Sequence, residues 1–481
     1  MKKYYSYLLL LLLIFSLSSL TKAQDFHALI EPAKIIKTDP KLITIAGYLV
    51  VPENRKKPQG NKIKIPFTFV RRPDQSATKN ISLYTTGGPG YSTTANIDSI
   101  SYSSGFLKFG GFIAFDQRGT KRALPSLDCG EVENAIKRSY REHKNRDSLV
   151  RLATLQCRKE LGEKGIDLSS YTTLESAEDI NDLRLALHID SLNLVGISYS
   201  GGLMLTVAKL HPEAVKTLIL NSPLPSFVSY EEKGLYNINE ALEQVFENCR
   251  LDSPQTYNNL KSQFQKYFAT LGNGKKFSFN YLEKGTADSI VIHYGKTELL
   301  DVIVNNLNNN DVKNLPRLIK QLIEGKHQPY LNELMNGYFA GNPSLSLGMR
   351  YSIYCSEQIA HSSKKKQDSE EKKLPWLMGY RFNNVDQALC DCWNIKPEPK
   401  SIKTPTISNV PALISAGDVD PWTRPYYNKL IKKTMPNTQL LIMHNRGHGA
   451  GFNIDGTDYL QLFMENPKKK LTAKSDKLMV E

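Results

Sequence analysis

Short apolar runs that alternate with helical stretches constrain the fold of this chain more than any other feature of its sequence. Eight runs bounded by turn residues read as buried strands: 47–52, 65–71, 81–86, 112–115, 192–197, 217–220, 412–415 and 439–443. From the third run onward they alternate with helix-like stretches such as 176–188, where apolar residues fall near one helical face. This alternation predicts a mostly parallel sheet that is covered on both faces.

The alternation stops near Ser222 and resumes near Pro411. A helical, polar and irregular block between two strands of one sheet is typical of a lid over the edge where loops carry function. An independent second domain is the alternative, and the return of the strand pattern argues against it. We expect an α/β core from residues 24–224 and 406–466. We expect an inserted, mainly helical lid at 225–405 and a basic tail at 467–481.

The first residues of the chain indicate export. Lys2 and Lys3 precede an apolar run from Leu8 to Phe15, and small and polar residues then lead to Ala23. This run is much shorter than the about 20 apolar residues of a spanning helix, so we interpret residues 1–23 as a cleaved secretory signal peptide. A retained anchor is the alternative. No later segment is apolar enough to span a bilayer, and we expect a periplasmic or extracellular protein with no transmembrane segment in the mature chain.

Charge and cysteine content limit which partners and cofactors we expect for this chain. The formal net charge is +14, but the basic residues are spread out and form no arginine-rich or aromatic-interleaved stripe, so we expect no nucleic-acid partner. Six cysteines in an exported chain predict disulfides, whose pairing stays open. Their spacing does not form a tetrahedral metal set with nearby histidines, and we expect no metal or organic cofactor. The oligomeric state stays open.

The stretch Gly196-Ile197-Ser198-Tyr199-Ser200 joins the predicted strand 192–197 to a helical run. A serine at the carboxyl end of a strand, with small residues two positions away on either side, is typical of a nucleophile elbow, because the sharp turn leaves no room for larger side chains. The second small residue is Ser200 rather than glycine, so the pattern is met in a relaxed form. A structural turn between strand and helix is the alternative.

Further motifs follow later strands in the order that such a serine requires. Asp418 and Asp420 come after the strand 412–415, and His448, between two glycines, comes after the last strand. The order serine, aspartate, histidine is that of α/β-hydrolases. His444 is the less favoured base. Before the elbow, glycines at 87, 88 and 90 follow a strand and would let backbone N–H groups approach a substrate oxygen.

Five ordered motifs together resemble the serine aminopeptidase family of proline iminopeptidases and secreted tripeptidyl aminopeptidases. They are G-G-P-G at 87–90, F-D-Q-R-G at 115–119, G-I-S-Y at 196–199, D-P-W-T-R-P at 420–425 and G-H-G at 447–449. The resemblance implies an α/β-hydrolase fold with Ser198 as nucleophile, His448 as general base and Asp420 as the group that orients the histidine. It also implies that Gly88 and Tyr199 donate backbone N–H groups to the oxyanion, and that Asp116 and Arg118 are structural.

The resemblance implies hydrolysis of peptides that have a free amino terminus, through an acyl-enzyme. An acid from the lid would hold that terminus. The candidates are Glu231, Glu232, Glu240 and Glu357, and Glu357 is favoured because it follows Cys355, which we expect in a disulfide. We therefore expect an exported serine peptidase that releases amino-terminal residues or short peptides. The alternatives are a carboxylic-ester hydrolase with the same triad and a catalytically silent binding protein.

Overall fold

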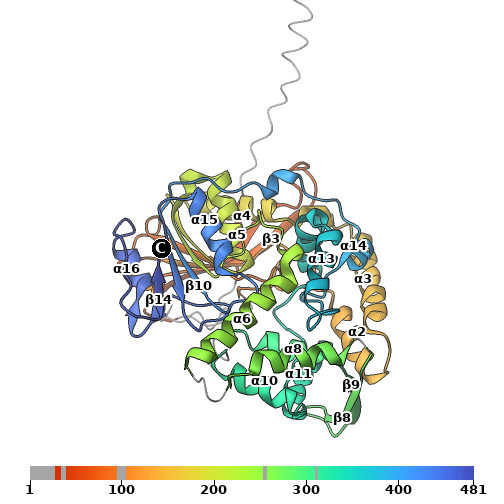
Figure 1. The fold of residues 1–481 in the computed structure, drawn as a ribbon. Helices are drawn as coiled ribbons and strands as arrows, with labels where there is room; N and C mark the ends of the chain where they lie inside the picture. The colour runs from red at the N-terminus through yellow and green to blue at the C-terminus, as the bar shows by residue number, and fades with distance from the viewer. Residues whose placement is uncertain (1–27, 34–38, 95–104, 253–256, 273, 309–311) are drawn as a thin grey trace, which may run out of the picture.

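A computed structural model shows a sheet in the upper part of the molecule and a helical part beneath it (Figure 1). It describes residues 28–33, 39–94, 105–252, 257–272, 274–308 and 312–481. The predicted signal peptide lies outside these residues. Within the described part of the chain, no helix is both long enough and apolar enough to cross a membrane.

Ten strands of the described residues form one sheet, in the order β1-β2-β3-β5-β4-β6-β7-β10-β11-β14. Their bounds are β1 Leu29–Pro32, β2 Ile43–Pro52, β3 Lys62–Arg71, β4 Ile81–Thr85, β5 Phe112–Phe115, β6 Leu192–Ile197, β7 Val215–Asn221, β10 Ala412–Gly417, β11 Thr438–Met443 and β14 Leu478–Val480. The pairs from β5 to β11 are parallel, and the pairs outside them are antiparallel. The mostly parallel central sheet is confirmed, and each of the eight predicted strands is present.

Helices cover both faces of the central strands, which explains why these strands read as continuous apolar runs. In β6, Leu194 belongs to the apolar core under α4 (Thr173–Ala186) and α5 (Tyr199–Leu210), which also includes Ile431 of α15 (Pro425–Thr434). The next residue, Val195, belongs to the core under α16 (Tyr459–Glu465). α4 begins three residues before the predicted helix, because the side chain of Thr172 accepts the backbone N–H of Glu175 and caps it.

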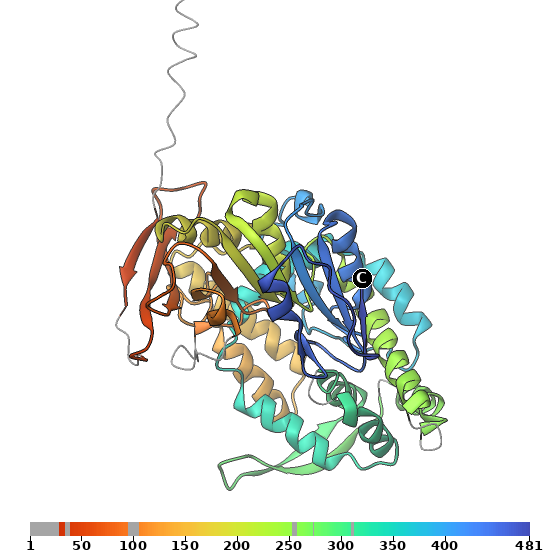
Figure 2. The same ribbon diagram turned by 90° about the vertical axis from the view of Figure 1, so that its left-hand side faces the viewer.

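The insertion between β7 and β10 is mainly helical, as predicted for a lid; its limits, 225 and 405, stay a prediction. It contains η5 Tyr230–Lys233, α6 Gly234–Asp252, α8 Leu260–Leu271, β8 Phe277–Leu282, β9 Ser289–Tyr294, α9 Lys296–Asn305, α10 Leu315–Ile323, α11 Gln328–Ala340, α12 Leu347–Ile353, the π-helix η7 Tyr354–Gln358, α13 Lys364–Lys373 and α14 Gln387–Trp393. Ile303, Ile319 and Leu331 are fully buried in an apolar core of its own. α8, α10, α11 and the β8–β9 hairpin lie beneath the sheet in both views (Figures 1 and 2).

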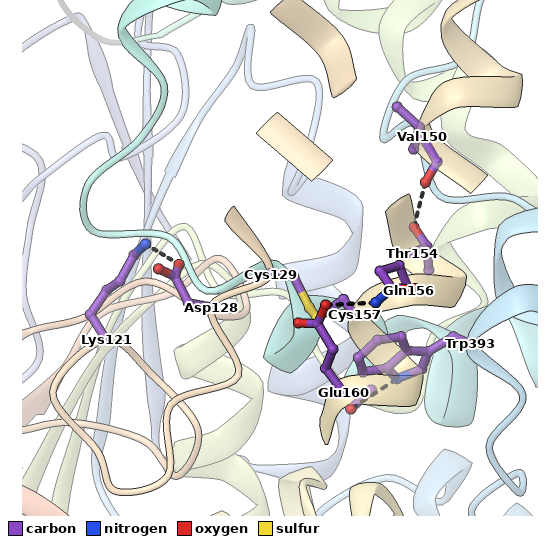
Figure 3. The surroundings of a disulfide bond; sticks show 10 residues. Lys121, Asp128, Cys129, Val150, Thr154, Gln156, Cys157, Glu160 and Trp393 are labelled. Carbon is purple, nitrogen blue, oxygen red and sulfur yellow. Dashed lines mark hydrogen bonds and ion pairs between the residues drawn. A yellow bond between two sulfur atoms is a disulfide. The ribbon is translucent and has the colours of Figure 1, made fainter. Parts of the chain in front are cut away.

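Two helices that come before the elbow also pack on the lid. They are α2 (Gly130–Arg141) and α3 (Arg146–Glu163), and Tyr140 of α2 is part of the lid core. A disulfide joins Cys129 to Cys157, and Figure 3 shows Trp393 of α14 beside it. A second disulfide joins Cys355 to Cys390. The two pairings resolve what the cysteine spacing left open.

Residues 467–481, which we expected as a basic tail, include a short strand. β14 pairs antiparallel with β11 and is the edge strand on that side of the sheet. The side chain of Leu478 is buried. Only three residues form this strand, and the lysines of residues 468–477 precede it, so neither length nor alternation predicted it.

Candidate active site

Ser198 lies at the turn between β6 and α5 in a conformation that L-residues rarely adopt, with φ 57° and ψ −125°. Its N–H donates to the carbonyls of Asn221 and Ser222, at 3.1 Å each. Its carbonyl accepts the N–H groups of Gly201 at 3.0 Å and Leu224 at 2.9 Å. The surrounding backbone therefore holds this strained turn in place, as a nucleophile elbow requires.

The serine in the relaxed position of the elbow has a structural role. Ser200 is fully buried, and its hydroxyl donates to the carbonyl of Thr85 at 2.8 Å and accepts the N–H of Ile197 at 2.8 Å. It thus ties the elbow to the end of β4. Gly196 is required on the other side, because a Cβ there would lie 2.7 Å from the carbonyl oxygen of Ser200.

The glycine loop after β4, residues 87–92, passes directly over the elbow; we call it the oxyanion loop. A Cβ on Gly87 would lie 2.5 Å from the carbonyl oxygen of Ile197 and 3.0 Å from Cβ of Ser198. Gly88 has φ +120°, which favours glycine. Tyr199 is the first residue of α5, so its N–H has no acceptor within the helix. Gly88 and Tyr199 thus stay the predicted oxyanion donors: Gly88 follows the glycine that meets Ser198, and Tyr199 follows Ser198 in the chain.

Asp116 and Arg118 hold loops around the site, in agreement with the structural role that the resemblance implied. The buried carboxylate of Asp116 accepts the N–H groups of Thr93 and Thr94, directly after the oxyanion loop. Burial raises the pKa of Asp116, and these hydrogen bonds offset only part of that rise. Arg118 makes a bidentate pair with Asp179 of α4, at 2.8 and 2.7 Å.

His448 is bound by an ionised carboxylate. Its Nδ1 lies 2.8 Å from Oδ2 of Asp420, which is fully buried and also accepts the N–H groups of Trp422 and Thr423. Burial would raise the pKa of Asp420, but the adjacent His448 and these hydrogen bonds outweigh it and hold the pKa below its usual range. Since Nδ1 is bound to the carboxylate, Nε2 is the ring nitrogen that can accept a proton.

The loop that carries His448 is bonded to Ser222, which also binds the elbow, and to the lid. The N–H of Gly449 donates to Oγ of Ser222 at 3.1 Å, and the carbonyl of the same Ser222 accepts the N–H of Ser198. On the lid side, the N–H of His448 donates to the carbonyl of Leu307 at 3.2 Å. Ser222 thus brings the predicted nucleophile and the predicted base into one bonded unit.

A second aspartate–histidine pair lies beside the first. Nδ1 of His444 is 3.0 Å from Oδ2 of Asp418. Burial raises the pKa of Asp418, although His444 counteracts it. Gly449, next to His448, bonds to Ser222, whose carbonyl accepts the N–H of Ser198, so Asp420 and His448 stay the predicted catalytic pair.

An acidic cavity of about 580 Å³ opens in the lid and is lined by Glu231, Glu232, Glu370, Glu371, Phe382 and Asn383, among others. Two successive rings link it to the base: Phe382, in the lining, stacks on Trp422 at 5.4 Å between centroids, and the ring of Trp422 lies 5.3 Å from that of His448. The carboxylate of Glu231 accepts Nδ2–H of Asn383 at 2.9 Å. Burial raises the pKa of Glu231 to about 7, against the lowering effect of Asn383 and of nearby cationic side chains.

Glu357, the favoured anchor for a substrate amino terminus, is already engaged within the protein. It is 2% exposed, and its two carboxylate oxygens accept the N–H and the hydroxyl of Thr173 at 2.7 and 2.6 Å. The Thr173 hydroxyl also bonds to the phenol of Tyr199 at 2.8 Å. Burial raises the pKa of Glu357 to about 7. Its role as anchor stays a prediction, and the geometry favours Glu231 among the four acids considered.

Sequence reasoning missed Phe382 and Asn383, which line this cavity, and Arg350, which donates to Asn383. They lie in the lid, where no local pattern of strand ends or glycines marks a functional loop, and only the fold brings them to the site. Among the residues that the structure describes, no three His, Cys, Asp or Glu side chains are grouped as metal ligands.

A serine on a strained elbow, an aspartate-bound histidine and a glycine loop, each after a strand of one parallel sheet, form an arrangement typical of α/β-hydrolases that act through serine. A family model described as the alpha/beta hydrolase fold matches residues 111–453. The chain belongs to this family.

Comparison with known proteins adds distant relatives. Tripeptidyl aminopeptidases of Streptomyces lividans and Streptomyces coelicolor are each 26% identical over 189 residues, which is 37% of this chain and 34% of the relative. The match therefore spans about a third of each relative. Two solved structures share the fold alone. Est816, described as an N-acyl homoserine lactone degrading enzyme, is 13% identical with a TM-score of 0.35 over 80% of this chain and 90% of that one. An epoxide hydrolase of Bacillus megaterium is 15% identical with a TM-score of 0.32 over 80% and 91%.

Proposed function

We propose that the protein is an exported serine peptidase that releases amino-terminal residues or short peptides from substrates with a free amino terminus. The observation that carries this proposal is the acidic cavity, which the stacked rings of Phe382 and Trp422 connect to His448. A hydrolase of acyl esters needs no carboxylates there, whereas a substrate ammonium group does. The distant tripeptidyl aminopeptidases support the same substrate class.

The proposed reaction is acyl transfer to water. Nε2 of His448 takes the proton of the Ser198 hydroxyl while Oγ attacks the scissile carbonyl carbon, and the backbone N–H groups of Gly88 and Tyr199 hold the oxygen that becomes negative. The C–N bond then breaks, and His448 gives its proton to the leaving amine. That amine is the shortened peptide. A water molecule, deprotonated by His448, then attacks the acyl-enzyme; the ester bond to Oγ breaks, His448 returns the proton to Ser198, and the amino-terminal residue or short peptide leaves with a new carboxylate. Asp420 orients the imidazole and stabilises its charged form.

Glu231 is the proposed anchor for the substrate amino terminus. Its carboxylate lines the cavity and is oriented by Asn383, so an ammonium group would meet a fixed acceptor. The two disulfides support export, because such bonds persist mainly in oxidising compartments.

The test is chromophore release from aminoacyl and tripeptidyl amides with a free or blocked amino terminus and from short acyl esters. We expect cleavage of the amides only when the terminus is free, with activity lost in Ser198→Ala. Cleavage of esters without any benefit from a free terminus would favour the ester hydrolase. A wild-type protein that neither cleaves these substrates nor reacts with a serine-directed phosphonate would be the silent binding protein.

A further inference from the structure

A segment of the lid is bonded to the oxyanion loop along its length. The N–H of Ser346 donates to the carbonyl of Gly90 at 2.9 Å, and the N–H of Ser92 donates to the carbonyl of Ser344 at 2.8 Å. The backbones touch, since a Cβ on Gly90 would lie 2.6 Å from the carbonyl oxygen of Ser346. The oxyanion loop is therefore held from the sheet by Asp116 and from the opposite side by the lid.

Arg350, four residues further along the lid segment, reaches the oxyanion loop with its side chain. Its Nη1 donates to the carbonyl of Gly88 at 3.1 Å, and its Nη2 donates to Oδ1 of Asn383 at 3.4 Å. The guanidinium lies over the ring of Tyr354, 4.7 Å from its centroid. The planar guanidinium can donate to two acceptors at once, which a lysine ammonium on one flexible stem does not reproduce.

The same contacts extend to the acidic cavity. Nδ2 of Asn383 donates to Glu231 and to the phenol oxygen of Tyr230, both at 2.9 Å. Gly88, Arg350, Asn383 and Glu231 thus form one chain of hydrogen bonds from the oxyanion loop to the proposed anchor. Glycine has few conformational preferences of its own, so the bond to its carbonyl helps to fix how Gly88 is oriented.

We propose that Arg350 is a positioning residue that fixes the oxyanion loop from the lid and couples it to the acidic cavity that receives the substrate amino terminus. The coupling to the cavity rests on the proposed aminopeptidase function. The hold on Gly88 does not, because any acyl substrate of Ser198 uses the same oxyanion donors.

The charge of Arg350 makes the pH dependence of substrate preference a test that a purely structural role would not affect. Arg350 and Lys403 face Glu231 and lower its pKa, and the other groups around it are Asn383 and the phenols of Tyr230, Tyr354 and Tyr427. In Arg350→Met, burial acts on Glu231 with one cation fewer, so the pKa of Glu231 rises further. The preference for a free amino terminus then sets in at higher pH. Arg350→Lys keeps the charge and leaves this pH unchanged.

The experiment compares kcat and KM of the wild type, Arg350→Met and Arg350→Lys on a free-amine aminoacyl amide and on an N-blocked acyl ester. We expect Arg350→Met to lower kcat on both substrates by about 10- to 100-fold, as small displacements of catalytic groups do. Arg350→Lys is expected to recover part of the kcat. Arg138→Met, which removes an exposed arginine paired with Glu142 on α2, is the matched control and keeps wild-type kinetics.

If Arg350→Met changes only KM, or changes neither parameter, the proposal that Arg350 positions the oxyanion loop is wrong. If the wild type shows no preference for a free amine, the aminopeptidase proposal fails, and the ester kcat still tests Arg350. Hydrogen exchange of the backbone amides in residues 86–94 measures the mobility of the oxyanion loop independently of enzyme activity. We expect faster exchange in Arg350→Met than in the control, and equal exchange contradicts the proposal. Arg350→Lys, which retains the charge, serves if Arg350→Met does not fold.

Discussion

At the residue scale, two aspartates two positions apart bind two different histidines, and the loop of one of these histidines bonds through Ser222 to the predicted nucleophile Ser198. Asp420→Asn should lower kcat by about 10⁴-fold, because an amide in place of the carboxylate favours the wrong tautomer of His448. Asp418→Asn removes a comparable bond to His444 and should lower kcat by less than about 10-fold, which is far below the effect of disrupting a triad. Steady-state kinetics on one amide substrate compare the two, and an equal loss in both variants contradicts the assignment.

The raised pKa of Glu231 predicts a pH limit on substrate preference. Below about pH 7 this carboxyl is neutral and cannot pair with an ammonium group, so the ratio of kcat/KM for free over blocked substrate should rise with pH through about 7. It should fall again above about 8, where the substrate amino group loses its proton. The ratio isolates Glu231, because both substrates share the catalytic groups.

Two isosteric variants assign this limit to one acid. Glu231→Gln should lower the ratio by on the order of 10- to 100-fold and flatten its acidic limb, since a hydrogen bond to a charged group contributes about 1.5–3 kcal/mol. Glu357→Gln should leave the rise of the ratio with pH unchanged, because the carboxylate of Glu357 binds Thr173 and does not line the cavity. The opposite result would return the anchor to Glu357.

At the scale of single elements, the turn after β4 depends on the absence of a side chain at Gly87. Gly87→Ala places a Cβ 2.5 Å from the carbonyl oxygen of Ile197, so the oxyanion loop must move away from Ser198. We expect kcat to fall by about 10²-fold or more. Gly162→Ala is the matched control, because its Cβ meets nothing within 4 Å and α3 gains roughly 0.5–1 kcal/mol of stability. Kinetics and thermal unfolding of both variants decide the matter, and unchanged kcat in Gly87→Ala contradicts it.

The short strand β14 makes a prediction about stability. Leu478 is 6% exposed and packs in the core under α16, while its neighbour Met479 is 56% exposed. Leu478→Ala should lower the free energy of unfolding by about 2 kcal/mol, and Met479→Ala should change it by less than about 0.5 kcal/mol. Denaturant titration of the two variants measures this difference. Equal stability would show that the end of the chain does not pair with β11 in solution.

How far the sequence predicts an element depends on whether the element follows a regular period. The predicted strand 112–115 has the same bounds as β5, because its four consecutive apolar residues lie between turn residues and are all buried. β14 has three residues and no period, and the lid has no repeated strand pattern. The motifs that place Ser198, Asp420 and His448 lie at strand ends, where local sequence marks the turn. Arg350 and Asn383 act through contacts across the lid, and such contacts leave no local signal.

At the scale of the whole molecule, the lid is bonded to both catalytic loops. The oxyanion loop bonds to Ser346, and the N–H of His448 bonds to the carbonyl of Leu307. A lid that swung away from the sheet would break both contacts and loosen both loops. We therefore expect the covered arrangement to be the active one, and under the proposed aminopeptidase function we expect a substrate to enter as a chain end rather than as the middle of a folded protein.

This architecture predicts strict removal of residues from the amino end. A decapeptide with a free amino terminus should be shortened stepwise, and its acetylated twin should stay intact, because acetylation removes the charge that Glu231 would bind. A folded protein of the same composition should show no internal cleavage. Mass spectrometry of the products over time distinguishes these outcomes, with Ser198→Ala as the control for contaminating peptidases. Internal fragments from the acetylated peptide would show that the lid admits an extended chain, and both the covered arrangement and the role of Glu231 would then be wrong.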